Sequence, residues 1–107
     1  MSNINEISIS AHGYERLLER TQCKQSKVIS FLENVWENGK TLESYNRKSS
    51  MFRYLSNTIP VGGEDRVGRV KGNTLFIYNK DKNNVITFIT CFEIPQKVIQ
   101  DKKKKKH

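Results

Sequence analysis

The chain has 107 residues, which suits one domain with a modest hydrophobic core. Its 19 lysines and arginines outnumber 11 acidic residues and give a formal net charge of +8, and residues 102–106, all lysine, supply five of the positive charges. The remaining body carries roughly +3, and a basic body with a basic end favours an acidic partner, most often nucleic acid.

Several classes of protein are excluded by what the chain lacks. We expect residues 1–6 to be a flexible lead or a short edge strand, and they contain neither the basic start nor the apolar stretch of a signal peptide. No apolar run is as long as a membrane span. We therefore expect a cytoplasmic protein without signal peptide or membrane contact. Cys23 and Cys91 form no CxxC pair and the two histidines add no metal-ligand spacing, which predicts reduced thiols, no metal and no cofactor. Segment 61–64 lacks the Lys-Ser/Thr ending of a phosphate-binding loop, which argues against ATP-dependent chemistry.

The N-terminal third of the chain predicts two helices. Residues 7–10 alternate with a period of two, which indicates a short strand or an extended lead-in. A helix is predicted over 11–22, with Ser10 as a good N-cap. A second helix is predicted over 26–37, where apolar residues recur at helical spacing until an Asn-Gly pair ends the pattern.

The middle of the chain gives weaker signals. Residues 41–45 fit a strand or an irregular segment, and 46–50 form a polar, loop-like stretch. Residues 51–55 carry apolar bulk with Arg53 inserted, and this pattern fits a strand and a short helix equally well. A proline and a Gly-Gly pair predict a loop over 57–64.

The sequence pattern of the C-terminal half predicts a β-sheet. Residues 66–71 and 74–79 flank a Gly-Asn turn and predict a β-hairpin, and 85–94 are rich in β-branched and aromatic residues, as in a central strand. Helices followed by strands predict an α+β fold, with two N-terminal helices packed on a C-terminal antiparallel sheet of about four strands. We place a single domain over 1–96 and a mobile, lysine-rich tail over 97–107.

The first predicted helix separates an apolar stripe from a cationic face. At ~100° per residue, His12, Arg16 and Arg20 lie within ~80° of one another, on the side away from the stripe. The free N–H groups of the first helical turn favour an anion, so this face could hold a phosphate. The alternative is a solvated polar face with an incidental histidine.

A second set of cations lies on the first strand of the predicted hairpin. With a period of two, Arg69 and Lys71 share one face, and Arg66 lies on the other unless Gly68 marks a bulge. If the face of Arg69 and Lys71 meets the polar side of the first helix, a basic groove results with His12 at one end. The alternative is a pair of solvated strand positions.

These residues could support metal-free RNA cleavage, which needs a base for the 2′-hydroxyl, a cation over the phosphate and an acid for the leaving oxygen. Histidine can act as base or acid near neutral pH, and the helical arginines or Lys71 could stabilise the phosphate charge. Thr90 or Tyr78 could orient the hydroxyl. The alternatives are that Thr90 is an ordinary β-branched strand residue and that Tyr78 lies at the edge of the core.

Three segments together resemble a known family. Ser10–Arg20 (SAHGYERLLER) is similar to the opening helix of small phage and bacterial proteins, 70–78 (VKGNTLFIY) resembles their hairpin, and 88–95 (FITCFEIP) resembles their closing strand. These proteins are members of the barnase/EndoU/colicin/RelE-like (BECR) ribonuclease superfamily. The resemblance covers roughly residues 7–95, although the segment 41–65 matches nothing in the pattern.

The resemblance implies N-terminal helices on a four- or five-stranded antiparallel sheet. It also implies that His12, Arg16 and Thr90 match the active-site positions, with Lys71 as a basic helper. The closing strand contains a second Ile-Thr pair, so Thr87 competes with Thr90 for the third position, and the distance of Thr90 from Pro95 favours Thr90.

Two functions follow as hypotheses. The first is a toxin-like, metal-independent endoribonuclease in which His12 is the acid or base and Arg20, Arg69, Lys71 and Tyr78 contact the RNA. The alternative is a non-catalytic, phage-encoded binding protein that reuses the fold to bind a host protein, a defence protein or nucleic acid. RNA is the expected partner, with an immunity, antitoxin or host protein as a further one, and the sequence does not fix the oligomeric state.

Overall fold

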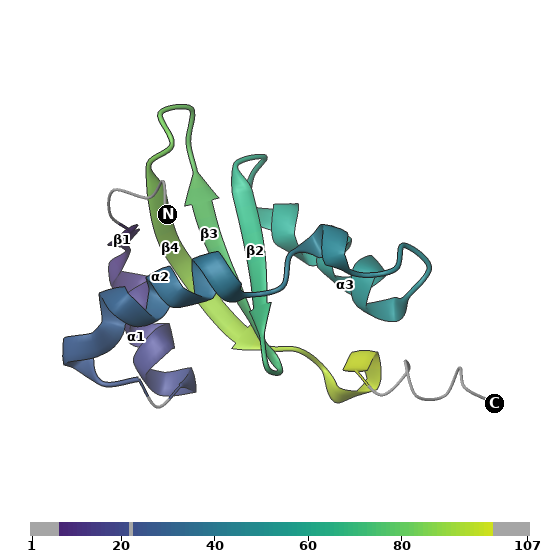
Figure 1. Cartoon of the computed structure of the whole chain (residues 1–107), viewed down its shortest axis with the longest axis horizontal. Helices are drawn as coiled ribbons and strands as arrows, with labels where there is room; N and C mark the ends of the chain where they lie inside the picture. The colour runs from purple at the N-terminus through teal and green to yellow at the C-terminus, as the bar shows by residue number, and fades with distance from the viewer. Residues whose placement is uncertain (1–6, 22, 100–107) are drawn as a thin grey trace.

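The computed structural model describes residues 7–21 and 23–99 (Figure 1). The helices and strands are β1 (Ile7–Ile9), α1 (Ala11–Arg20), α2 (Val28–Asn38), α3 (Ser50–Thr58), β2 (Arg66–Lys71), β3 (Thr74–Lys80) and β4 (Ile86–Glu93). The strands form one four-stranded sheet in the order β1-β4-β3-β2. The α+β class predicted from the sequence is confirmed.

The prediction of a wholly antiparallel sheet is wrong, because β1 runs parallel to β4. Ile7 pairs with Ile86 and Ile9 with Phe88, while β2–β3 and β3–β4 are antiparallel. The parallel pair arises because the chain leaves β1 directly into α1, and α1 packs back onto β4 beyond the end of the pair. The ambiguous segment 7–10 therefore supplies the fourth strand.

The predicted hairpin is confirmed in register and turn. Arg66 lies opposite Asn79 and Lys71 opposite Thr74, and Gly72 adopts φ 61°, a left-handed conformation that favours glycine. The strand passes Gly68 without a bulge, so Arg66 and Arg69 lie on opposite faces. A Cβ at Gly68 would lie 2.5 Å from Ile59 Cδ1, so the glycine makes room for that packing.

Both predicted N-terminal helices are confirmed within two residues at most of their expected ends. Ser10 caps α1 by accepting a hydrogen bond from the Gly13 N–H at 2.9 Å, and α1 ends at Arg20, with Gln22 outside the described residues. A 3₁₀ turn at Gln25–Lys27 precedes α2. The α2 helix then ends at Asn38, with Gly39 as its C-cap.

Residues 51–55, whose pattern fits a strand and a short helix equally well, belong to α3. Ser49 caps it by accepting a hydrogen bond from the Phe52 N–H at 3.1 Å. The loop predicted over 57–64 is wrong for residues 57–62, because α3 continues to Thr58 and a 3₁₀ turn follows over Ile59–Gly62. Leu55 and Ile59, four residues apart, are both buried, which explains why this segment stays helical.

The sheet is covered on both faces, and β3 divides the core. Its side chains alternate: Phe76 and Tyr78 pack under α1 and α2, and Leu75 and Ile77 pack on the α3 side. Figure 1 shows α2 crossing the sheet at the front. The first cluster includes Leu17, Leu32, Val35 and Phe88, and the second includes Leu55, Ile59, Val70 and Ile94.

The C-terminal segment returns to the domain after β4. A helical turn follows Pro95, whose carbonyl accepts the Val98 N–H at 3.0 Å, and Val98 and Ile99 pack partly buried against the α3-side cluster. Val98 and Ile99, assigned to the tail from the sequence, thus contact the domain. The remaining tail residues, 100–107, and the N-terminal lead, 1–6, lie outside the described residues.

Candidate functional site

The first turn of α1 rests directly on the backbone of β4. Ser10 donates its N–H to the Phe88 carbonyl at 3.1 Å and its hydroxyl to the Ile89 carbonyl at 3.4 Å. Gly13 is buried at this contact, and a Cβ there would lie 2.8 Å from the Ile89 oxygen and 2.9 Å from that of Phe88. The glycine therefore lets α1 approach β4, and this contact fixes the position of the neighbouring His12.

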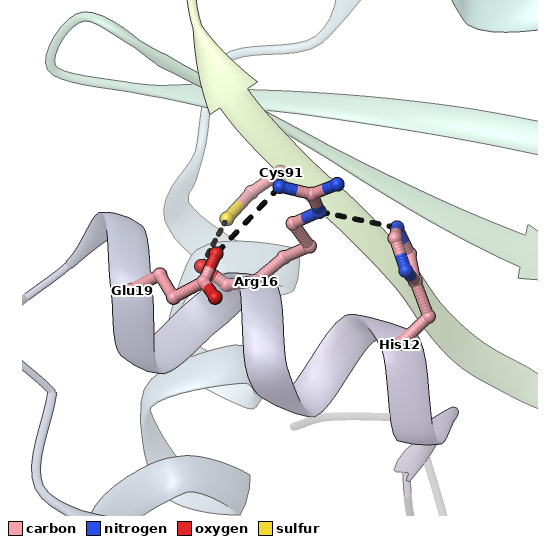
Figure 2. A network of polar contacts seen from close by, with 4 residues as sticks. All are labelled: His12, Arg16, Glu19 and Cys91. Atoms are coloured by element: carbon pink, nitrogen blue, oxygen red, sulfur yellow. Dashed lines mark hydrogen bonds and ion pairs between the residues drawn. The ribbon is translucent and has the colours of Figure 1, made fainter.

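His12 and Arg16 form a polar pair at the surface of α1. The Arg16 Nε–H donates to His12 Nε2 at 3.3 Å, and Arg16 Nη1 lies 3.6 Å from Glu19 Oε1 (Figure 2). His12 is exposed, and the Arg16 side chain is 38% exposed. Since the bond to Arg16 uses the lone pair on Nε2, His12 holds an unprotonated nitrogen toward the cation. The sequence prediction that these two side chains share one face is confirmed.

A buried thiol lies beneath this pair. Cys91 Sγ–H donates to the Arg16 carbonyl at 3.7 Å (Figure 2). Burial raises the pKa of Cys91 to about 11, although Arg20 and Arg16 act to lower it. The thiol therefore stays protonated at neutral pH, where it ties α1 to β4 and is not a nucleophile. Both Cys91 and Cys23 are free thiols.

Thr90, the third predicted catalytic residue, lies on the opposite face of the sheet. The register of β3 and β4 shifts between Ile77, which faces Thr90, and Tyr78, which faces Phe88, so Ile89 is an extra residue in β4. Cys91 consequently packs on the α1 side, whereas Thr90 shares the α3 side with Ile77. No hydrogen bond among the described residues joins Thr90 to His12 or Arg16.

The competing residue Thr87 gives no better match. It pairs with Asn79, two residues after Ile77 on β3, and so also lies on the α3 side. A regular strand would place Thr87 and Thr90, three residues apart, on opposite faces, but the bulge at Ile89 puts both on the same face. Neither threonine converges with His12 and Arg16 on the α1 side.

Tyr78 is part of the core, so its assignment as an RNA contact is wrong. Its side chain is 0% exposed, and its hydroxyl donates to the Leu32 carbonyl at 2.9 Å. Burial raises the pKa of Tyr78 far above its ordinary value. A fully buried ring with a satisfied hydroxyl cannot contact a nucleic acid.

Arg69 and Lys71 share one face, as predicted, but that face meets α2 and not α1. The Arg69 Nε–H donates to the Trp36 carbonyl at 2.9 Å, and the guanidinium lies 4.1 Å from the centroid of the Trp36 ring. Lys71 Nζ donates to Asn34 Oδ1 at 3.1 Å. The basic groove that would have joined Arg69 and Lys71 to His12 is therefore not formed.

Arg20 lies apart from the His12–Arg16 pair, at the far end of α1. It lines a hollow of about 240 Å³ together with Thr74 and Glu93. The acidic Glu93 offsets the charge of Arg20, which makes this hollow a weak place for an anion.

Sequence analysis missed two residues, Lys40 and Tyr45, that follow the C-terminal end of α2. Lys40 and Tyr45 line a hollow of about 320 Å³ with Lys71. Tyr45 belongs to segment 41–65, which matched no pattern, and Lys40 directly precedes that segment. The fold brings both residues to Lys71. No local signal could have indicated this contact.

In comparisons with known proteins, no family model, no curated protein and no solved structure matches the chain. Among residues 7–21 and 23–99, no group of three or more His, Cys, Asp or Glu side chains is arranged to hold a metal ion. In the same residues, no helix has the length and apolar character to span a membrane.

Proposed function

We propose that this protein is a small, metal-independent endoribonuclease in which His12 and Arg16 act on one phosphodiester. The observation that carries the proposal is the bond from Arg16 Nε to His12 Nε2 at 3.3 Å on an exposed part of α1. It puts an imidazole nitrogen that can accept a proton, once Arg16 has moved away, beside a guanidinium, and these are two of the three groups that the reaction needs. The resemblance of Ser10–Arg20 to the opening helix of BECR ribonucleases supports it.

The reaction is a transesterification at phosphorus. His12 Nε2 accepts the proton of the 2′-hydroxyl while the 2′-oxygen forms a bond to phosphorus and the bond from phosphorus to the 5′-oxygen breaks. The products are a 2′,3′-cyclic phosphate and a 5′-hydroxyl, and the leaving oxygen takes its proton from solvent. Arg16 leaves the imidazole and stabilises the charge that develops on the phosphate oxygens.

The ion pair between Glu19 and Arg16 is weak enough for the Arg16 side chain to move. The Nη1–Oε1 distance of 3.6 Å joins groups that are 38% and 64% exposed, and such exposed pairs contribute little to stability. A dianionic phosphorane can therefore replace Glu19 and His12 as the partner of the guanidinium.

A second candidate function is a non-catalytic binding protein, and the position of Thr90 favours it. With both threonines on the α3 side, the His12–Arg16 pair lacks the hydroxyl that the family pattern would supply. In this alternative the protein binds RNA or a host or defence protein and leaves it intact.

Incubation of a labelled single-stranded RNA with the protein in EDTA tests the proposal. Wild type should cut the RNA and leave 2′,3′-cyclic phosphate ends, while His12→Ala and Arg16→Gln should not. Glu15→Ala, at an exposed position of the same helix, is the matched control and should cut like wild type. If no variant cuts RNA, or if His12→Ala cuts as fast as wild type, the catalytic proposal is wrong.

A further inference from the structure

Two neighbouring hollows lie between the C-terminal end of α2 and the segment that leads to α3. Their volumes are about 320 and 250 Å³, and they share Lys40 and Tyr45 in their linings. Lys71 lines the first hollow, and Ser49 and Ile99 line the second. We call this surface the Lys40 groove.

The backbone holds Lys40 firmly at the groove. Lys40 forms an isolated antiparallel bridge with Val70 through two hydrogen bonds, of 2.8 and 2.9 Å, at the outer edge of β2. Gly39 allows this close approach, because a Cβ there would lie 2.6 Å from the Val35 oxygen and 3.1 Å from the Arg69 Cβ. Lys40 thus comes from a fixed edge of the sheet and not from a free loop.

An aromatic ring lies next to the lysine. Lys40 Nζ is 5.9 Å from the centroid of the Tyr45 ring, and Tyr45 is half-buried, which raises its pKa. The Tyr45 hydroxyl has no hydrogen-bond partner within the part of the chain that the structure describes. Ring and hydroxyl are therefore available to a ligand in the groove.

The charge of the groove is unbalanced. The residues that line the two hollows include Lys40 and Lys71 and no Asp or Glu. Lys71 bonds to the neutral amide of Asn34, and the charge of Glu43, on the same segment as Lys40, acts on Arg69. The Lys40 groove thus attracts an anion more strongly than the hollow at Arg20, where Glu93 opposes the cation.

The lysine run follows the groove in the sequence. Ile99 lines the second hollow, and residues 102–106, all lysine, come shortly after it in the chain. These five charges add to the attraction of the protein for a polyanion.

We propose that the Lys40 groove binds single-stranded RNA, with phosphates on Lys40 and Lys71 and a base stacked on Tyr45. An aromatic ring flanked by cations is how proteins hold unpaired strands, since only an unpaired base offers a face to stack. This site goes beyond the endoribonuclease proposal. It does not involve His12 or Arg16, and it would bind RNA even if these two residues did not catalyse cleavage.

Fluorescence anisotropy with a labelled oligouridine tests the groove in the full-length His12→Ala protein, where cleavage cannot interfere. Lys40→Glu should weaken binding about tenfold or more, and Lys40→Gln should reduce the slope of log K against log salt by about 0.7, the contribution of one phosphate contact. Lys82→Glu is the matched control, because this exposed residue follows β3 at the opposite end of the hairpin, and it should change affinity far less.

Tyr45 distinguishes RNA from other polyanions. Tyr45→Leu keeps apolar bulk and removes the stacking face, so it should weaken oligouridine binding about five- to hundredfold, and Tyr45→Phe should retain binding. Inorganic polyphosphate, which has no bases, and poly-glutamate should be insensitive to either change. Thermal melts of each variant separate loss of binding from loss of folding.

Removal of residues 102–107 should reduce both affinity and salt dependence and leave the melting temperature unchanged, because Val98 and Ile99 stay in place. Equal effects of Lys40→Glu and Lys82→Glu would overturn the proposal. So would equal affinity of Tyr45→Leu and wild type for oligouridine with both proteins folded, since the groove would then be a general polyanion surface.

Discussion

Two surfaces of this protein carry cations, and they are built in opposite ways. On α1, Arg16 already has partners: it donates to His12 and lies 3.6 Å from Glu19. In the Lys40 groove, the lining contains two lysines and no carboxylate. The α1 pair holds a potential proton acceptor next to a cation, whereas the groove offers positive charge and an aromatic ring.

This difference suits the α1 surface to cleavage of RNA and the Lys40 groove to binding of RNA. A base and a guanidinium in direct contact can act on one phosphodiester, but a cation that is partly neutralised attracts a polyanion weakly. Lysines without a carboxylate partner next to a ring attract and hold a strand, but the described lining of the groove contains no histidine or carboxylate to act as a base. We therefore expect RNA to be bound at the Lys40 groove and to be cut at the His12–Arg16 pair of α1.

The largest structural effect should come from Gly13→Ala. The added Cβ would meet the Ile89 and Phe88 oxygens at 2.8 and 2.9 Å, so α1 must move away from β4. We expect a loss of about 1–3 kcal/mol in unfolding free energy and a loss of RNA cleavage. RNA affinity at the Lys40 groove should persist below the melting temperature.

Urea denaturation and anisotropy measure the two consequences of this change. Ser30→Ala, at an exposed position of α2, is the control and should alter neither. If Gly13→Ala had normal stability and normal cleavage, the close contact between α1 and β4 would not be what positions His12.

A smaller effect should appear at high pH, through Cys91 beneath the α1 pair. Its pKa is raised by burial from 9.0 to about 11 in the folded protein. The stabilisation is therefore complete below pH 9 and is lost as the pH rises toward 11, because the unfolded chain loses this proton first. We expect the unfolding free energy to fall by about 1 kcal/mol between pH 8 and pH 10 from this thiol.

Urea denaturation of wild type and Cys91→Ala across this range isolates the contribution of the thiol. The variant starts from lower stability but should lose less between pH 8 and pH 10. Tyr78, whose pKa is also raised, contributes to both proteins and cancels in the difference. Parallel pH profiles would show that the Cys91 thiol is not buried as described.

An effect of similar size should come from Ser10→Ala, which removes the cap of α1. The Ser10 hydroxyl accepts from the Gly13 N–H and donates to the Ile89 carbonyl, so its loss should cost about 1 kcal/mol of unfolding free energy. Ser10→Asp should restore most of the cap. Thermal melts measure both variants, and equal melting temperatures for Ser10→Ala and wild type would contradict this account of how α1 begins.

Local signals made much of the fold predictable from the sequence. Ser10 and the Asn-Gly pair marked where α1 begins and α2 ends, and the Gly72 turn marked the hairpin. The parallel pairing of β1 with β4 was not predictable, since three residues of alternation do not specify a partner strand. The helix α3 was ambiguous because its short apolar run fits both periods, and tertiary packing of Leu55 decides between them.

The candidate site was likewise predictable from the sequence only in part. His12 and Arg16 are four residues apart on one helix, so their contact follows from helical geometry alone. The bulge at Ile89 has no sequence signal, and it moves Thr90 to the other face of the sheet. The Lys40 groove depends on the bridge between Lys40 and Val70, a long-range contact that composition and spacing do not reveal.

The most direct test of the division between the two surfaces is a crossed measurement on two variants. RNA affinity and the single-turnover cleavage rate at saturating protein are determined for His12→Ala and Lys40→Glu. We predict that His12→Ala loses cleavage and keeps its affinity, and that Lys40→Glu loses affinity and keeps its rate once the RNA is saturated. If His12→Ala lowers affinity as much as Lys40→Glu does, or if Lys40→Glu abolishes cleavage at saturation, binding and chemistry are not divided between these surfaces.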